Sequence, residues 1–284
     1  MVTLYQEARA ALRTSAFHPK KRLGQNFLIH EGVINAIVRL IDPSEEDDIV
    51  EIGPGLGFLT RRLVEVAREV WAIEVDTFLI EWLRRSPLQN HPSFHLLHED
   101  ILKVRLAEFL PARKVKLVAN LPYSISTPVL FRLFEFRDRF SVLVLMVQRE
   151  VAERMTASPG TKSYGTLSVW CQVHGQILDK VTVSAEAFFP RPKVRSTILK
   201  IGLYPEPLAP SEDLPFLRSV VRAAFGRRRK TLSNALGDLF EKGRKGTETL
   251  LRQQGIDPQR RGETLSVDEF TRLARGLRLF VAEG

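Results

Sequence analysis

The stretch EIGPGLGFLT, residues 51–60, joins the end of an apolar run to a glycine-rich turn and the start of a helical pattern. The run 47–53 reads as a short buried strand, and apolar residues recur at helical spacing over 58–67. Because glycine has no Cβ, the glycines of this turn let a ligand approach the backbone closely. Dinucleotide folds use G-x-G-x-x-G, whereas here the third glycine comes one residue early and Pro54 lies inside the turn. Many strand-to-helix turns contain glycine, so the turn alone is weak evidence of a nucleotide site.

Strands and helices alternate along the chain on both sides of this turn. Apolar runs typical of buried strands occur at 47–53, 70–76, 93–100, 115–122 and 140–148. Helical spacing occurs at 31–41, 58–67, 77–86 and 128–136. This pattern predicts an α/β fold with a parallel sheet covered on both faces. Two further runs lack a helix between them, and we expect them to form an antiparallel pair that closes the sheet: 180–190 and 196–204.

The last part of the chain follows a different pattern. A proline-rich acidic connector spans 205–215 and marks the expected domain boundary. Helical patterns dominate beyond it, at 216–225, 231–240, 248–255 and 266–280. The sequence therefore predicts two domains, 1–205 and 206–284, of which the second is small and all-helical.

The composition is that of an ordinary soluble globular protein, with 284 residues, 44% of them hydrophobic and 26% charged. The most apolar stretch, 141–147, is too short to cross a bilayer, and the N-terminus has no secretory signal pattern. The single cysteine, Cys171, excludes an intrachain disulfide and a cysteine-rich zinc site. His95 and His98 would point to opposite faces of a strand. We expect a cytoplasmic protein without a metal site.

The net charge of +9 is concentrated at the two ends of the chain. Residues 1–26 contain five lysines and arginines against one glutamate, and the chain from Leu203 onward contains fifteen against eleven acidic residues. A nearly neutral body with basic ends suggests that the ends hold a polyanion. Ordinary solubility would explain the charge equally well.

Acidic residues stand at the expected ends of the two strands that follow the glycine turn. Glu74 closes the second strand roughly 20 residues after the turn, where a carboxylate can hold ribose hydroxyls. Asp100 closes the third strand at the same edge of the sheet. Either residue alone would be read as a solvated helix cap. Together with the glycine turn they favour an adenosine-type cofactor.

The fourth strand leaves the core through Asn120, Leu121, Pro122 and Tyr123, again at that edge. The amino group of a nucleobase is a poor nucleophile because its lone pair is delocalised into the ring. The Asn120 amide oxygen and the Leu121 carbonyl could accept its two hydrogens and orient the lone pair, with Pro122 fixing the turn. Tyr123 offers a ring face for stacking. A proline turn with a buried tyrosine explains these four residues equally well.

Five motifs in one order extend this interpretation to nearly the whole chain. They are KKRLGQNFL (20–28), EIGPGLGFLT (51–60), ANLPYSIS (119–126), SYGTLSV (163–169) and FFPRPKVRS (188–196). Together they closely resemble the small-subunit ribosomal RNA adenine N6,N6-dimethyltransferase family. The resemblance implies a Rossmann-like class I methyltransferase sheet with an antiparallel terminal strand. It also implies transfer of two methyl groups from S-adenosyl-L-methionine to N6 of each of two adjacent adenosines near the 3′ end of the small-subunit RNA, in small-subunit biogenesis.

The resemblance also implies roles for individual residues. Asn26 and Leu28 would close over the cofactor, while Gly53 and Gly55 would lie along its methionine part. Glu74 would hold the ribose, Asp100 would read the adenine amino group, and Asn120 would touch both cofactor and target. The catalytic residues would be Asn120 and Leu121 together with Tyr123 and Phe188, the last two facing each other across a flipped base. The family's basic segment, expected to contact RNA phosphates, corresponds to Arg227, Arg228, Arg229 and Lys230.

The resemblance assigns cofactor binding and catalysis to 1–205, with its basic N-terminal segment, and RNA binding to 206–284. The partners would be the small ribosomal subunit and its RNA, bound by a monomer. The related large-subunit adenine methyltransferase that confers macrolide resistance is the nearest alternative. The small-subunit type is favoured by KKRLGQNFL (20–28), YGTLSV (164–169) and RRRKTLSNAL (227–236). A non-catalytic RNA-binding or assembly factor on the same fold is a second alternative, against which Glu74, Asp100 and the Asn120 turn argue. The glycine spacing disfavours a nicotinamide dehydrogenase.

Overall fold

The computed structural model describes residues 3–14, 25–239 and 243–282. The chain divides into two compact units, the first made of Met1–Ala152 with Ile177–Leu203 and the second of Glu153–Gln176 with Tyr204–Gly284. The break at 203/204 lies beside the expected boundary at 205. In contrast to that expectation, the segment 153–176 belongs to the second unit, because its apolar side chains, Val169 and Val173 among them, are buried in the core of the C-terminal helices.

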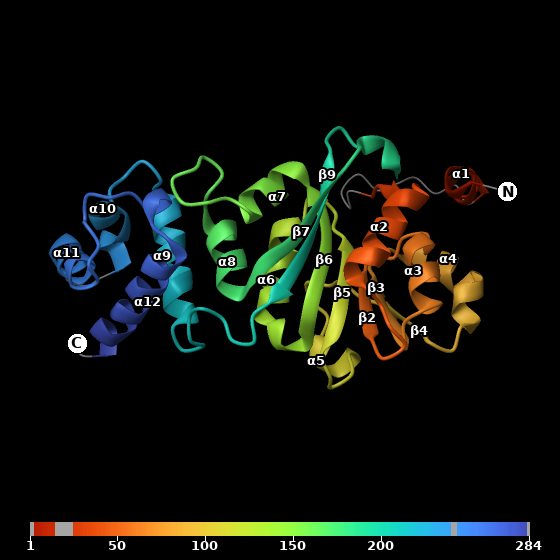
Figure 1. The fold of residues 1–284 in the computed structure, drawn as a ribbon, viewed down its shortest axis with the longest axis horizontal. Coiled ribbons are helices and arrows are strands. Elements are labelled where there is room, and N and C mark those ends of the chain that lie inside the picture. Colours follow the sequence, from red (N-terminus) through yellow and green to blue (C-terminus); the bar gives the residue numbers. More distant parts are fainter. Residues whose placement is uncertain (1–2, 15–24, 240–242, 283–284) are drawn as a thin grey trace. The chain divides into compact units, whose positions relative to one another are not determined.

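A seven-stranded sheet forms the centre of the first unit (Figure 1). Its strand order is β4-β3-β2-β5-β6-β9-β7. The first five strands in this order pair in parallel, and β9 pairs with β6 in antiparallel orientation. The strands are β2 (Asp48–Ile52), β3 (Glu69–Glu74), β4 (Phe94–His98), β5 (Val115–Asn120), β6 (Phe140–Gln148), β7 (Gly175–Val183) and β9 (Ser196–Leu203).

Helices follow the parallel strands as the alternating pattern predicts. Every residue of β2 is buried. Because successive side chains of a strand point to opposite faces, both faces of the sheet are covered there, as expected. The helices of this unit include α2 (Glu31–Ile41), α3 (Phe58–Val64), α4 (Thr77–Arg85), α5 (Leu106–Phe109) and α6 (Ser126–Glu135).

The run 180–190 does not form one strand, although its first part lies in β7, which neighbours β9 in the sheet as expected. β7 begins earlier, at Gly175, and ends at Val183. Ser184 then caps a short 3-10 turn, with its Oγ accepting from the Glu186 N–H at 3.4 Å. The chain continues as β8 (Phe188–Phe189), which pairs in antiparallel orientation with β1 (Phe27–Leu28) in a separate two-stranded sheet. A local turn therefore divides this run between two sheets.

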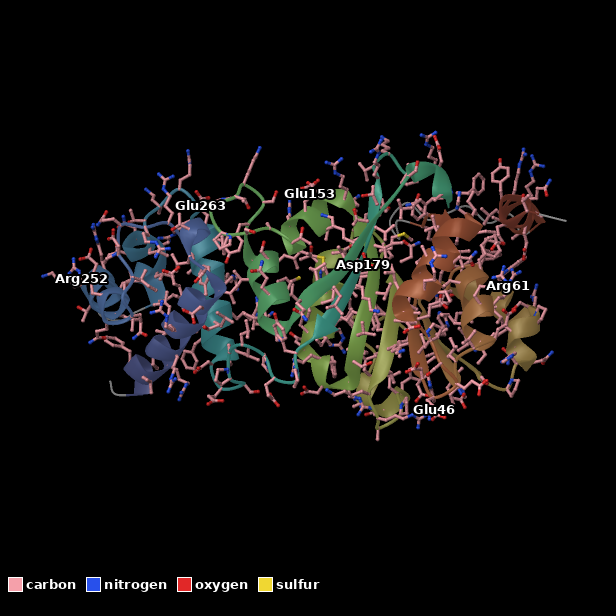
Figure 2. The ribbon with its side chains drawn as sticks, in the orientation of Figure 1. Glu46, Arg61, Glu153, Asp179, Arg252 and Glu263 are labelled. Carbon is pink, nitrogen blue, oxygen red and sulfur yellow. The ribbon has the colours of Figure 1, made fainter. Side chains whose placement is uncertain are left out.

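Helix α1 (Leu4–Thr14) has no counterpart among the predicted elements. Its alanines Ala8 and Ala11 are buried in the core cluster of the first unit. Glu7 forms an ion pair with Arg61 of α3. Figure 2 labels Arg61. These contacts hold the helix on the first unit.

The second unit is helical, as the sequence predicts. A capping box starts its last helix, because the Ser266 N–H donates to Glu269 Oε2 at 2.8 Å and the Glu269 N–H donates to Ser266 Oγ at 3.1 Å. Within the described residues, no helix is long and apolar enough to cross a membrane. The helices are α8 (Thr166–His174), α9 (Leu214–Gly226), α10 (Leu232–Leu236), α11 (Gly243–Gln253) and α12 (Val267–Ala282), and α7 (Arg149–Met155) begins in the first unit and ends in the second.

Candidate active site

One cleft lies at the carboxyl ends of β2, β3 and β5 in the first unit. Its walls come from residues 25–28, from the glycine turn, from the ends of β3 and β4, and from 120–125. Ligands of open α/β sheets bind at this edge. All seven residues that the sequence assigns to cofactor binding line it: Asn26, Leu28, Gly53, Gly55, Glu74, Asp100 and Asn120.

The glycine turn has a backbone that residues with side chains rarely adopt. Gly53 has φ +71° and Gly55 has φ +58°. A Cβ on Gly55 would lie 3.2 Å from the Phe27 ring, whereas a Cβ on Gly53 would meet no atom within 4 Å and would occupy open space of the cleft. The Gly53 N–H donates to the Ile73 carbonyl at 2.9 Å and ties the turn to β3. The turn therefore leaves room for a ligand against bare backbone.

The Glu74 carboxylate is held rigidly at the edge of the cleft. Its Oε1 accepts hydrogen bonds from the Val75 and Asp76 N–H groups, each at 2.9 Å. Burial raises the pKa of Glu74, while these backbone bonds act against that rise. Although Glu74 is buried, it lines the cleft, and a fixed carboxylate there is suited to accept hydrogen bonds from a diol such as a ribose.

Glu51 also lines the cleft, although the sequence analysis did not single it out. It is the next-to-last residue of the buried strand β2, and its Oε2 accepts from the Thr60 hydroxyl at 2.6 Å. Burial raises the pKa of Glu51 to about 7, and the neighbouring Glu74 carboxylate acts in the same direction. The only sequence signal that could have singled out Glu51 was its position, two residues before the first glycine of the turn. Across the described ranges, no group of three or more potential ligands could hold a metal ion.

Asp100 lies in the turn after β4 and not at the end of the strand, which stops at His98. Its Oδ1 accepts from the Leu102 N–H at 2.9 Å, so the carboxylate is oriented locally.

Gln25, which lines the cleft, is anchored to the start of helix α4, because its Nε2 donates to Asp76 Oδ2 at 2.9 Å. Asp76 Oδ1 in turn caps helix α4. Neither Gln25 nor Asp76 is predicted as a site residue from the sequence. The bond between their side chains attaches the segment 25–28 to the N-terminus of α4.

Asn120 ends β5, as predicted, and its amide is oriented by a hydrogen bond. Nδ2 donates to the Asn26 carbonyl at 3.2 Å. Within residues 3–14, 25–239 and 243–282, no group hydrogen-bonds to Oδ1. The amide oxygen is therefore the side of Asn120 that can accept a hydrogen bond from a ligand. Leu121 is fully buried and its N–H donates to the Met146 carbonyl at 3.0 Å.

Tyr123 lines the cleft, but Phe188 does not. The Tyr123 hydroxyl lies 2.8 Å from Oγ of Ser196, a residue that the sequence analysis did not single out. Burial raises the pKa of Tyr123, so the phenol keeps its proton. Phe188 pairs with Leu28 in the two-stranded sheet, and its side chain is buried in the core cluster. The structure thus brings Tyr123 to the cleft without a facing Phe188.

The basic residues 227–230 lie in the second unit, in the turn that follows α9, and so are not a helix face. Arg228 is bound within the unit, because its Nε donates to Glu263 Oε2 at 2.6 Å and one Nη donates to the Lys162 carbonyl at 2.7 Å. Figure 2 labels Glu263. Arg228 and Glu263 line a shallow depression in this unit, and further basic residues line it with them: Lys162, Arg229 and Arg261. The predicted N-terminal basic residues Lys20, Lys21 and Arg22 lie outside the described residues.

The sheet order and the cleft define a class of protein. A parallel doubly wound sheet closed by an antiparallel strand, with a glycine turn after β2 and an acidic residue ending β3, is the fold of the class I methyltransferases.

Comparisons with known proteins narrow this class to a family. A model of the ribosomal RNA adenine dimethylase family matches residues 16–278, so the chain belongs to that family and is a methyltransferase. It is 42% identical over 259 residues to ribosomal RNA small subunit methyltransferase A of Clostridium botulinum (strain Langeland), covering 91% of this chain and 94% of the relative. It is 43% identical over 270 residues to the protein of that name from Geobacter sulfurreducens, covering 94% and 98%.

Two solved structures resemble the chain as well. A dimethyladenosine transferase from Plasmodium falciparum matches with a TM-score of 0.72 and 26% identity, covering 86% of this chain and 94% of that one. The 23S rRNA methyltransferase ErmE matches with a TM-score of 0.65 and 25% identity, covering 89% and 100%. Both confirm the predicted fold class.

The raised pKa of Glu51 makes the stability of the protein depend on pH. The folded chain keeps the Glu51 proton between about pH 4.5, the reference pKa, and about 7, where the unfolded chain has lost it. The contribution to the free energy of unfolding is therefore full below that window and declines by about 3 kcal/mol as pH rises through it. Glu51→Gln keeps an acceptor for Thr60 and cannot ionise. Denaturant unfolding of both proteins without ligand should show the parent losing that stability relative to the variant. A difference that is constant with pH would contradict the raised pKa.

Proposed function

We propose that the chain uses S-adenosylmethionine to dimethylate N6 of two adjacent adenosines near the 3′ end of small-subunit ribosomal RNA, in small-subunit biogenesis. The observation that carries the proposal is the meeting of two kinds of residue in one cleft. Gly53 and Glu74 suit an adenosine-bearing cofactor, and Asn120 presents an acceptor beside them. Family membership supports adenine as the target.

The residues of the cleft fit the cofactor. Asn26 and Leu28 close the side formed by residues 25–28, and the open space at Gly53, beside Gly55, accommodates the methionine part. The Glu74 carboxylate accepts hydrogen bonds from the ribose. Asp100 reads the adenine amino group of the cofactor.

The turn after β5 prepares the target nitrogen. Bound S-adenosylmethionine supplies a methyl group on a sulfonium, an electrophile that needs no activation by the protein. Asn120 Oδ1 and the Leu121 carbonyl accept the two N–H hydrogens of the adenine and direct the nitrogen lone pair. Tyr123 stacks on the base. The nitrogen loses its proton to water after transfer, so the site needs no general base. Because Phe188 is buried and pairs with Leu28, its part is to support the segment 25–28.

The small subunit is the preferred substrate because the relatives named for it are 42–43% identical to this chain, against 25% for ErmE. Transfer of labelled methyl groups to purified, unmethylated small and large subunits separates the two substrates. The proposal predicts labelling of the small subunit only. Labelling of the large subunit would favour the ErmE-type reaction. We infer that the enzyme acts as a cytoplasmic monomer with the small subunit as its partner.

Glu74 should matter for cofactor binding. Glu74→Gln removes the charge and keeps the amide oxygen as an acceptor, so S-adenosylmethionine should bind about 10- to 100-fold more weakly, as expected for the loss of charge-assisted hydrogen bonds. Glu81→Gln, an exposed change on α4 away from the cleft, serves as the control. Calorimetry measures both, and the parent should bind NAD negligibly. NAD binding as tight as that of S-adenosylmethionine would refute the cofactor assignment.

Asn120 should matter for turnover. An acceptor that strengthens its bond in the transition state typically contributes about 2–4 kcal/mol, so Asn120→Ala should lower the single-turnover rate about 10²–10³-fold with RNA affinity unchanged. Asn120→Asp also loses the donor to the Asn26 carbonyl but keeps an acceptor. It should retain partial activity with weaker cofactor binding. Equal rates in the two variants would mean that Asn120 only anchors residue 26.

RNA binding should depend on the turn after α9. We propose that Arg227, Arg229 and Lys230 contact phosphates, whereas Arg228 holds the turn through Glu263. Arg229→Ala with Lys230→Ala should reduce the slope of log affinity against log salt by about 1.5–2. Cofactor affinity should not change. The control pair is Arg84→Ala with Arg85→Ala at the exposed end of α4. An unchanged salt slope in the first pair would show that this turn does not contact RNA.

A further inference from the structure

The hydroxyl of Tyr123 connects two segments that lie far apart in the sequence. It is 2.8 Å from Oγ of Ser196. Tyr123 lines the cleft and is half-buried, whereas Ser196 is fully buried at the first position of β9. Ser196 is not among the described residues that line the cleft. Its side chain is connected to the cleft through the bond to the Tyr123 hydroxyl.

Strand β6 fixes both partners of the bond. On one side Asn120 pairs with Met146, and on the other Ser196 pairs with Gln148. The Arg149 N–H donates to the carbonyl of residue 195 at 3.0 Å and extends the second pairing beyond the strand. Because β5 and β9 flank β6, the turn after β5 and the start of β9 come together at one edge of the sheet.

The turn that carries Tyr123 is also closed from within. The Ser126 hydroxyl and the Ile125 N–H both donate to the Pro122 carbonyl, at 2.9 and 3.1 Å. The backbone end of Tyr123 is therefore fixed, and the bond to Ser196 fixes the far end of the ring. A ring held at both ends loses little conformational entropy when a base stacks on it. The placement of the base matters because small errors in the positions of reacting atoms lower the rate of transfer.

We propose that Ser196 is a positioning residue for methyl transfer, because its hydroxyl holds the Tyr123 ring as a preset platform for the target adenine. The inference rests on the proposed function. Ser196 contacts neither cofactor nor base and acts only through the hydroxyl of Tyr123. The two hydroxyls therefore contribute through one shared bond.

A double-mutant cycle tests this coupling. Ser196→Ala and Tyr123→Phe each remove one partner, and the double variant removes both. Single-turnover methyl transfer at saturating RNA and cofactor should fall about tenfold in each single variant. The double variant should be as slow as either single one, within about twofold, because the second change has no bond left to break. Affinities for RNA and S-adenosylmethionine should stay within about twofold of the parent.

Ser86→Ala is the control, since that hydroxyl also donates a hydrogen bond in the first unit, to the Leu83 carbonyl at 2.7 Å, but lies outside the cleft. It should transfer methyl groups at the parent rate. Parent-like rates in Ser196→Ala, or losses that multiply in the double variant, would overturn the inference while leaving the proposed function intact. A fall in melting temperature in Ser196→Ala without a fall in rate would also overturn it, as a structural role. A parent protein that methylates no RNA would overturn the proposed function and this inference with it.

Discussion

The parallel pairing of three adjacent strands is the constraint on which the site depends. Ile52 of β2 pairs with Ile73 of β3 on one side and with Ala119 of β5 on the other. The next residues along these strands are Gly53, Glu74 and Asn120, which come from positions up to 67 residues apart in the sequence. A slip of one residue in either pairing would turn these groups to the wrong face. The register of buried apolar residues thus sets the geometry of the cleft.

The segment 25–28 completes the cleft by polar bonds. Its Gln25 side chain donates to Asp76, and its Asn26 carbonyl accepts from Asn120. The short pairing of β1 with β8 holds the same segment against Phe188. The side chain assigned to catalysis is therefore oriented by the segment assigned to cofactor closure. This coupling gives a physical reason for the two motifs to occur together.

The sequence predicts those features that follow from local periodicity. The helix 31–41 and the strand 140–148 have the predicted bounds because their apolar patterns are uninterrupted. Long-range pairing is not visible in such patterns, so the splitting of 180–190 between two sheets and the burial of Phe188 could not be foreseen. Arg228 illustrates the same limit, since a basic run predicts phosphate contact but not which arginine is bound to Glu263. Periodicity does not carry the site roles either. Those of Glu74, Asn120 and Tyr123 follow from side-chain chemistry at the strand ends, and those of Asn26, Leu28 and Phe188 follow from the motif resemblance.

In the proposed reaction, one cleft presents the amino group of particular adenines to a methyl donor. Primer extension on unmethylated small subunits, incubated with the purified protein and S-adenosylmethionine, tests it most directly, because dimethylation of N6 blocks base pairing and stops the polymerase. We expect a new stop at two adjacent adenines near the 3′ end of the RNA, which is lost when the methyl donor is omitted. Methyl incorporation without that stop, or a stop elsewhere in the RNA, would contradict it.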